Sequence, residues 1–331
     1  MRRIIQVGLG KMGEIWADCV AASDKWQSAA YVDSNRKNLT AAAARHGMPE
    51  ARCYASLEKA LREVEADALL DVTPQQNRKE VCLAALDHGL HVLSEKPLAD
   101  TIENAREIVN RAEKLGRTHM VAQNYRYQPA AQTAKRFIQR GGLGDVGYVG
   151  VNFHKGPHFG GFREAIAYPL LLDMAIHHVD MMRCILNSDV VRVQGISINA
   201  PWNWNKGDAT LMAHFEMANG VVVGYWGSWV AQGWETSWNG DWRFDGSKGV
   251  LLWERDAFFF SGGPQRRRKV SLIKWPIGHQ AFLLEHFAKC LDQGEEPETS
   301  GRRNLNSLAS TFALVQSVRQ KRQVEVAELL K

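Results

Sequence analysis

Residues 4–20 read IIQVGLGKMGEIWADCV, and they carry the clearest indication of fold class in the chain. A short apolar run leads into a Gly-x-Gly-x-x-Gly pattern made by Gly8, Gly10 and Gly13, and the apolar residues that follow have helical spacing. In such a unit the first glycine permits a tight turn, the second lets the backbone approach a pyrophosphate, and the third lets the helix pack on the strand. The helix N-terminus then offers its N–H groups to the phosphates. The stretch therefore predicts a dinucleotide-binding unit.

Strand and helix patterns alternate through the first third of the chain. The predicted strands cover residues 4–7, 29–32, 66–73, 91–94 and 119–122, and the predicted helices cover 12–20, 40–46, 79–88 and 102–115. Such alternation is typical of a parallel, doubly wound sheet. We therefore expect an α/β domain of the Rossmann type over residues 1–123.

The pattern changes after about residue 124. Runs rich in β-branched and aromatic residues at 148–153, 190–198, 209–216, 221–228 and 242–244 predict a large antiparallel sheet. Helices are predicted over residues 130–140, 170–186, 280–291 and 305–319. We expect residues 124–331 to form a second domain for substrate binding and oligomerisation, with a C-terminal helix that can pack back on the first domain.

Composition narrows the class of protein. The formal charge of +5 on 331 residues is too small to single out nucleic acid as a partner. Five cysteines lie far apart without a Cys-x-x-Cys pair, which fits a reducing compartment. The N-terminus lacks the apolar stretch of a signal peptide, and no run approaches the roughly 18 apolar residues that span a bilayer. We expect a cytoplasmic protein with neither a nucleic-acid nor a membrane partner.

Asp33 ends the second predicted strand, 20 residues beyond Gly13. A carboxylate at this place can hydrogen-bond the adenosine ribose hydroxyls, and it repels a 2′-phosphate, which favours NAD over NADP. Arg36 keeps NADP open as the alternative, because a nearby arginine can hold that phosphate or lie against the adenine. We predict NAD as the cofactor.

Two further segments carry groups suited to charge and proton chemistry. Lys96 follows a buried strand, where it would face the ligand crevice and could stabilise an alkoxide-like charge; a surface lysine is the alternative. Asp173, His177 and Asp180 have helical spacing. Histidine is a suitable proton acceptor near neutral pH, and a carboxylate beside it can orient the ring; a paired core histidine is the alternative.

These segments together resemble the Gfo/Idh/MocA family, the relatives of glucose–fructose oxidoreductase and inositol dehydrogenase. The resemblance spans nearly the whole chain, and it rests on Gly8–Gly13, Thr73-Pro74, Glu95-Lys96-Pro97, Asn124–Tyr127, Asp173–Asp180 and Arg319–Val326. It implies a Rossmann domain followed by a domain with an open, mostly antiparallel sheet flanked by helices. It also implies NAD(P)-dependent hydride transfer between nicotinamide and a hydroxyl-bearing carbon of a sugar or cyclic polyol.

The resemblance assigns roles to individual residues. Lys96 would polarise the reacting oxygen, and His177 would take the hydroxyl proton while the hydride leaves for the nicotinamide. Asp173 would bind the substrate or position the other two groups. Pro97 would follow a cis peptide bond that turns Lys96 into the cleft. Members of the family often pair through their sheets, so we expect a homodimer or homotetramer.

The chain departs from the family pattern at two places. After Thr73-Pro74, many relatives carry Asn and then a His, whereas this chain has Gln75-Gln76-Asn77-Arg78. The segment Tyr125–Pro129 is also more aromatic than the usual arginine-rich version. The first departure concerns contacts on the cofactor side and leaves the catalytic set intact.

The tryptophans and a glycine-rich loop point to the substrate side. The chain holds 11 tryptophans, mostly after residue 200, and indole faces can pack on sugar rings or between subunits. We favour the subunit interface for most of them and the substrate for Trp202 and Trp204. Residues 154–161 combine glycines with polar groups and are predicted to border the substrate. No metal is predicted, because Gly156-Pro157 prevents His154 and His158 from sharing a helix face.

The complete candidate site has three sets of residues. The catalytic set is Lys96, Asp173 and His177. The predicted cofactor-binding residues are Gly8, Gly10, Lys11, Met12, Gly13, Asp33, Ser34, Arg36, Thr73, Pro74, Asn77, Glu95, Lys96, Pro97 and Asn124. The predicted substrate-binding residues are Lys96, Tyr125, Arg126, His154, His158, Asp173, His177, Trp202 and Trp204.

Two other functions remain open at this stage. One is an NAD-dependent glycoside hydrolase, in which the hydride is borrowed and returned without net NADH. The other is a non-catalytic NAD-binding sensor or scaffold, against which the presence of Lys96, Asp173 and His177 argues. A carbohydrate or polyol dehydrogenase is the leading hypothesis.

Overall fold

A computed structural model describes residues 1–263, 267–275 and 278–331 of the chain. Its contacts divide the chain into two compact units, Met1–Asn124 with Ile277–Leu305 and Tyr125–Pro276 with Asn306–Lys331. Helix α9 (Gly301–Gln320) runs through the second point of division. The sequence predicts a boundary after residue 123; in the division by contacts, the first unit also includes residues 277–305.

The first unit is built on a six-stranded parallel sheet with the order β3-β2-β1-β4-β5-β6. Its strands are β1 (Arg2–Val7), β2 (Trp26–Val32), β3 (Cys53–Tyr54), β4 (Ala68–Asp71), β5 (His91–Ser94) and β6 (His119–Val121). Its helices are α1 (Lys11–Ala22), α2 (Arg36–His46), α3 (Leu57–Glu63), α4 (Arg78–Asp87), α5 (Ile102–Lys114) and α8 (His279–Gln293). This confirms the predicted doubly wound α/β fold.

The strands of this sheet are apolar runs because both of their faces are covered. Ile4, Ile5, Leu69 and Leu70 are fully buried. Such burial on both faces is typical of parallel strands between two helical layers. The strand order reverses between β1 and β4, and ligands of doubly wound sheets bind in the crevice at that switch point.

Aromatic and backbone contacts hold the late segment 277–305 to this unit. The ring of Trp26 stacks on Phe287 with 5.5 Å between centroids, and its indole N–H donates to the Leu284 carbonyl at 3.0 Å. The amide of Val121 donates to the carbonyl of Thr299 at 2.8 Å. These partners lie about 180 or more residues apart in the chain, so local sequence patterns could not reveal the pairing.

The second unit is built on a nine-stranded sheet with the order β14-β13-β12-β11-β7-β10-β9-β8-β15. Its strands are β7 (Val146–His154), β8 (Val190–Ile198), β9 (Thr210–Met217), β10 (Val222–Ser228), β11 (Asp241–Gly246), β12 (Gly249–Glu254), β13 (Ala257–Ser261), β14 (Arg267–Val270) and β15 (Val324–Glu325). Among these strands β7 and β10 pair in parallel and the others are antiparallel. The predicted mostly antiparallel sheet is confirmed.

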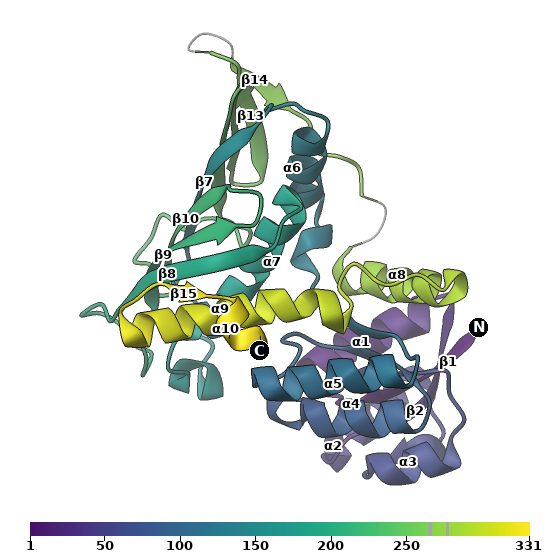
Figure 1. The fold of residues 1–331 in the computed structure, drawn as a ribbon. Coiled ribbons are helices and arrows are strands. Elements are labelled where there is room, and N and C mark those ends of the chain that lie inside the picture. Colours follow the sequence, from purple (N-terminus) through teal and green to yellow (C-terminus); the bar gives the residue numbers. More distant parts are fainter. Residues whose placement is uncertain (264–266, 276–277) are drawn as a thin grey trace. The chain divides into compact units, whose positions relative to one another are not determined.

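Helices α6 (Pro129–Gln139) and α7 (Ala175–Leu186) lie together along this sheet (Figure 1). The predicted helix over 170–186 begins instead with a wider π-helical turn, Leu170–Met174, that follows Pro169. Such π turns are frequent at functional sites.

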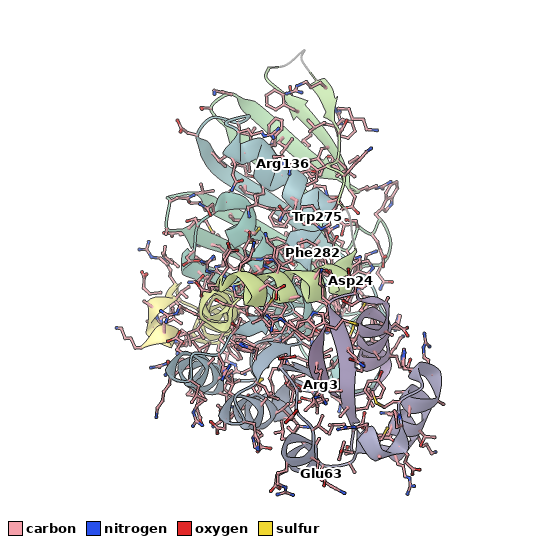
Figure 2. All side chains as sticks on the ribbon, turned by 90° about the vertical axis from the view of Figure 1, so that its right-hand side faces the viewer. Arg3, Asp24, Glu63, Arg136, Trp275 and Phe282 are labelled. Carbon is pink, nitrogen blue, oxygen red and sulfur yellow. The ribbon has the colours of Figure 1, made fainter. Side chains whose placement is uncertain are left out.

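Side chains fill the interior of each unit, and charged groups such as Glu63 and Arg136 are exposed on the outside (Figure 2).

The outward face of the sheet carries a row of large apolar side chains across neighbouring strands. Ile196 on β8 pairs with Met212 on β9, and Met212 pairs with Trp226 on β10. These side chains are 57%, 40% and 51% exposed, respectively. A contiguous apolar row of this kind on a sheet face is typical of an interaction surface.

All five cysteines are free thiols. Within the described parts of the chain, the helices lack any apolar run of the length that a bilayer requires.

Candidate active site

The glycine turn between β1 and α1 is shaped as a phosphate cradle. Gly8 has φ +91°, and a Cβ there would lie 2.6 Å from the Val72 carbonyl oxygen. A Cβ on Gly13 would lie 2.3 Å from the Gly8 carbonyl oxygen, whereas a Cβ on Gly10 would meet no heavy atom within 4 Å. The space over Gly10 is therefore open at the N-terminus of α1, where backbone N–H groups favour an anion.

Buried side chains hold this turn in place. Gln6 is 1% exposed and donates to the Gly13 carbonyl at 2.7 Å. Asp33 accepts from the Leu9 amide at 2.8 Å, from the Asn35 amide at 2.7 Å and from the Asn38 side chain at 3.1 Å. The Asp33 carboxylate thus lies at the end of β2, directly against the glycine turn.

The turn after β5 lies beside the turn after β4. Asp71 pairs in register with Ser94, and the Glu95 amide donates to the Asp71 carbonyl at 2.8 Å. The Lys96–Pro97 peptide bond is cis, as the resemblance implied. Glu95 accepts from the indole N–H of Trp16 at 2.8 Å, which ties this turn to α1.

The sheet therefore gathers three predicted segments at one edge. The glycine turn, Thr73-Pro74 and Glu95-Lys96-Pro97 follow the carboxyl ends of β1, β4 and β5, which are neighbours in the sheet. Ser34 and Arg36, beyond β2, are exposed, as are Lys11, Met12 and Asn77; Asn124, at the end of this unit, is half-buried. The open space over Gly10, the free helix N-terminus and the carboxylate of Asp33 fit a dinucleotide.

In the second unit, Tyr125 and His177 lie against each other. Their ring centroids are 4.2 Å apart, and His177 is 5% exposed on α7. Burial, and then the charges of Asp173 and Asp256, raise the pKa of Tyr125 to about 12. The Tyr125 phenol therefore stays protonated at neutral pH and can act as a hydrogen-bond donor.

Asp173 lies in the π turn and forms an ion pair that the sequence analysis did not anticipate. The Nε atom of Arg163 is 3.2 Å from a carboxylate oxygen of Asp173, and its guanidinium lies over the Phe159 ring at 5.2 Å. Arg163 belongs to a short 3-10 helix, Gly161–Ala165, directly after the glycine-rich loop. Only the charge of Arg163 close to that loop could have signalled this contact.

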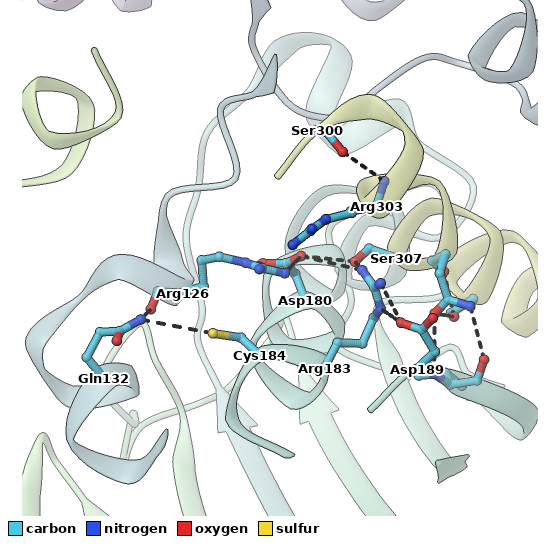
Figure 3. A network of polar contacts seen from close by, with 12 residues as sticks. Arg126, Gln132, Asp180, Arg183, Cys184, Asp189, Ser300, Arg303 and Ser307 are labelled. Carbon is cyan, nitrogen blue, oxygen red and sulfur yellow. Dashed lines mark hydrogen bonds and ion pairs between the residues drawn. The ribbon is translucent and has the colours of Figure 1, made fainter. Parts of the chain in front are cut away.

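Arg126 and Asp180 form a buried pair within the second unit (Figure 3). Two guanidinium nitrogens donate to the two carboxylate oxygens at 2.6 Å each, and Ser307 adds a hydrogen bond to Asp180 at 3.0 Å. Although burial lowers the pKa of Arg126, the charge and hydrogen bonds of Asp180 raise it above its ordinary value. This geometry favours a structural role, so the predicted substrate contact of Arg126 remains only a prediction.

The predicted substrate loop lies among aromatic side chains at one end of the sheet. His158 stacks on Trp204 with 4.0 Å between centroids, whereas His154 lies edge-on to Trp226 at 6.1 Å. Trp202 is 56% exposed, and its indole N–H donates to the Val230 carbonyl at 3.0 Å. Among the described residues, none accepts a hydrogen bond from the buried indole N–H of Trp204.

Glu235, which no sequence motif indicated, holds the loop 154–161 in place through hydrogen bonds. Its carboxylate accepts from the Lys155 ammonium and from the Gly156 amide, both at 2.8 Å, and these bonds lower the pKa of Glu235. The described residues contain no group of three or more His, Cys, Asp or Glu side chains that could hold a metal ion.

Comparison with known proteins matches both parts of the chain. Residues 2–123 match the oxidoreductase family with the NAD-binding Rossmann fold, and residues 131–252 match the GFO/IDH/MocA C-terminal domain. The chain is 26% identical to D-apiose dehydrogenase of Paraburkholderia graminis, over 91% of this chain and 83% of that protein. It is 27% identical to inositol 2-dehydrogenase of Corynebacterium glutamicum, over 67% of this chain and 66% of that protein.

A solved structure agrees with the fold. An oxidoreductase from Agrobacterium radiobacter, in complex with NAD⁺, L-tartaric acid and magnesium, superimposes with a TM-score of 0.90 at 20% identity, over 99% of each chain. The two family models together match most of the chain and carry the assignment. The chain belongs to the GFO/IDH/MocA family of oxidoreductases, with an NAD-binding Rossmann fold.

Proposed function

We propose that this protein oxidises a secondary hydroxyl of a sugar or cyclic polyol, or reduces the corresponding ketone, with NAD as the hydride carrier. The observation that carries the proposal is the position of Lys96. It follows the carboxyl end of β5, one strand from the Thr73-Pro74 turn, and that turn meets the glycine turn. A lysine at this edge of a doubly wound sheet faces the ligand crevice.

The roles of the chain's own residues follow from their chemistry. The ammonium of Lys96 stabilises the negative charge that develops on the reacting oxygen. The imidazole of His177 takes the hydroxyl proton, and Asp173 binds or orients the substrate beside it. When bound, the nicotinamide supplies the acceptor for the hydride. The buried indole N–H of Trp204 is a donor suited to a substrate hydroxyl.

The names of the relatives support the substrate class. Relatives over most of the chain include enzymes for D-apiose and for 1,5-anhydro-D-fructose, and another relative is named for inositol. All three names refer to polyhydroxylated small molecules, the class on which the proposed chemistry acts.

A turnover screen tests the activity directly. The wild-type protein is incubated with NAD and a set of sugars and polyols, and NADH absorbance is followed. Lys96→Ala is expected to lower kcat by at least about 100-fold, because a donor to the developing charge is lost, while NAD binding persists. Lys25→Ala, at an exposed lysine of the same unit, serves as the control.

The possible results separate the hypotheses. Retained turnover in Lys96→Ala would remove this residue from its proposed role. Glycoside cleavage that requires NAD but yields no NADH would favour the hydrolase. NAD binding with no turnover of any substrate would favour a sensor.

The preference for NAD is a proposal of its own. Asp33 directly follows β2, with its carboxylate against the glycine turn, where it would repel a 2′-phosphate. We expect Asp33→Ala to raise the ratio of NADP to NAD turnover by about 10-fold or more, and Arg36→Ala to lower NADP turnover where any exists. Equal use of both cofactors by the wild-type protein would contradict this preference.

We also propose that the exposed face of the nine-stranded sheet pairs with a second copy of the chain. The row Ile196, Met212 and Trp226 is apolar and continuous across β8, β9 and β10. Trp226→Glu is expected to shift the protein toward monomer in light scattering, since it places a charge within that apolar row. A wild-type protein that is monomeric at micromolar concentration would refute the proposal.

A further inference from the structure

Arg78 is a buried cation whose three side-chain nitrogens each have a different acceptor. The Nε atom is 3.3 Å from a carboxylate oxygen of Asp71, one Nη atom donates to the Thr73 carbonyl at 2.7 Å, and the other donates to the Pro97 carbonyl at 2.5 Å. The side chains of Arg78 and Asp71 are 1% and 0% exposed. A planar guanidinium can satisfy three acceptors in fixed directions at once, which a lysine cannot do.

The two backbone carbonyls that accept from Arg78 belong to two neighbouring turns. The Thr73 carbonyl lies in the turn after β4, and the Pro97 carbonyl lies in the turn after β5. Asp71 itself accepts from the amide and the hydroxyl of Thr73, at 2.8 and 2.6 Å. Asp71 therefore shapes the first turn, and Arg78 connects that turn to the second.

The position of Arg78 is unfavourable for a cation in general terms. It is the first residue of helix α4, where the helix dipole disfavours positive charge, and it is removed from water. Buried ion pairs can often be replaced by apolar residues without loss of stability, so packing alone does not require one. What an apolar residue could not supply is the directed link between the two carbonyls.

We propose that Arg78 is a positioning residue that fixes the Lys96 turn against the Thr73-Pro74 turn for hydride transfer. This inference rests on the proposed function, because it takes Lys96 as the group that acts on the reacting oxygen. Arg78 acts through the backbone of Pro97, the residue directly after Lys96, and needs no contact with substrate. The segment Gln75–Arg78, which departs from the family pattern, would then contribute this positioning residue on the cofactor side of the site.

The titratable neighbours of Arg78 other than Asp71 are uncharged at neutral pH. His119 forms a hydrogen bond with Ser94 at 2.9 Å, and burial, followed by the charge of Arg78, lowers the pKa of His119 to about 3. Cys82 is also buried, and its thiol lies 3.7 Å from Asp71. Burial, and then the charge of Asp71, raise the pKa of Cys82, so this thiol stays neutral. Asp71 is therefore the charged partner of Arg78 among these neighbours.

The first test separates directed geometry from charge and from stability. Arg78→Lys keeps the charge but loses the fork, and Arg78→Met loses both. We expect Arg78→Lys to lower kcat by about 100-fold, as a displacement near 1 Å of a catalytic group would, with the substrate KM changed less than about 3-fold. Arg183→Lys is the matched control, because Arg183 is 10% exposed and bridges Asp189 and Ser307 outside the proposed catalytic set.

The second test does not depend on activity. Amide hydrogen exchange is measured on the full-length protein without cofactor, for peptides that cover residues 72–78 and 94–100. Arg78→Lys is expected to speed exchange in both peptides by about 10-fold or more relative to the rest of the first unit, since the link between the turns is lost. Arg183→Lys should leave both peptides unchanged.

Each outcome bears on the inference. Wild-type kcat in Arg78→Lys would overturn it, and so would unchanged exchange in either turn. Equal losses of kcat in Arg78→Lys and Arg183→Lys, in proportion to their losses of stability, would reduce Arg78 to a structural role and overturn the proposal. Faster exchange in both turns, in a protein that turns over no sugar or polyol, would show that the link exists but that the proposed function has failed.

Discussion

A buried arginine–aspartate pair lies in each unit, Arg78 with Asp71 and Arg126 with Asp180, and the two pairs differ in what the arginine contacts. In the second unit, two guanidinium nitrogens of Arg126 donate hydrogen bonds to the carboxylate of Asp180, at 2.6 Å each. In the first unit, Arg78 shares its nitrogens between Asp71 and two backbone carbonyls of separate turns. The first arrangement joins two side chains, whereas the second joins two segments that border the predicted cofactor site.

Burial and charge are therefore not enough to separate a structural ion pair from a functional one. Both arginines are at least nine-tenths buried, and both would leave a buried carboxylate if they were removed. What distinguishes them, among the contacts described, is that Arg78 also donates to two backbone carbonyls. A bidentate contact fixes two side chains against each other, while a cation that reaches distant carbonyls also fixes the geometry of the segments that those carbonyls flank.

The largest expected effect tests the structural half of this comparison. Arg126→Met leaves Asp180 without its main cation, and the nearest other one, Arg183, is 3.9 Å away. We expect the free energy of unfolding to fall by about 3–5 kcal/mol, because an uncompensated buried charge is costly. Denaturant-induced unfolding, followed by far-UV circular dichroism, measures this loss.

The double variant Arg126→Met/Asp180→Leu is the control for that experiment. It removes both charges and should recover most of the lost stability, since apolar replacement of a whole buried pair is often neutral. A loss below about 1 kcal/mol in Arg126→Met, together with a raised substrate KM, would instead support the substrate contact predicted for Arg126 from the sequence.

Much of the fold could be predicted because its patterns are local. The strands at 91–94 and 190–198 agree with β5 and β8 to the residue, since each is an apolar or alternating run bounded by turn residues. The hairpin of β12 and β13 was not predicted. Its turn places Arg255 and Asp256 at φ +48° and +61°, a conformation usually signalled by Asn-Gly or Asp-Gly, and Arg-Asp without a glycine is a weaker signal.

The candidate site could be predicted where a motif fixes the backbone, and only there. Gly8, Gly10 and Gly13 act through backbone conformation and close approach, which a local pattern encodes. The contacts of Asp173 with Arg163 and of Arg78 with Pro97 depend on how separate segments meet. Such contacts arise from tertiary packing, and no spacing within one element announces them.

A smaller effect compares the two units through their buried histidines. Burial lowers the pKa of His119 in the first unit to about 3 and that of His178 in the second to about 4. In the unfolded chain both histidines have a pKa near 6.5. Below that pH the unfolded state therefore binds protons that the folded state does not bind. Stability is therefore full above about pH 6.5 and is lost on acidification, by up to about 1.4 kcal/mol per pH unit for each histidine.

Unfolding free energies at pH 7, 6 and 5 test this dependence. His119→Gln and His178→Gln should each flatten the profile, and equal flattening would mean that both units share one cooperative transition. The same slope in the wild-type protein and in both variants would show that other groups dominate. Separate transitions, with each variant affecting one of them, would mean that the two units unfold independently.

The smallest expected effect on stability is that of Gly10→Ala, which contrasts with Gly13→Ala in the same glycine turn. Gly13→Ala would place a Cβ 2.3 Å from the Gly8 carbonyl oxygen, so we expect a loss of about 1–3 kcal/mol from overpacking. In Gly10→Ala the added Cβ would meet no heavy atom within 4 Å, and at this helix N-cap the substitution should cost less than about 1 kcal/mol.

The expected effect of Gly10→Ala lies in NAD binding, because the methyl group enters the space that a pyrophosphate would approach. Calorimetric titration with NAD should show affinity at least about 10-fold weaker for Gly10→Ala. If Gly10→Ala bound NAD as tightly as the wild-type protein, the open space over Gly10 would not be the pyrophosphate site, and the phosphates would have to lie elsewhere along this edge of the sheet.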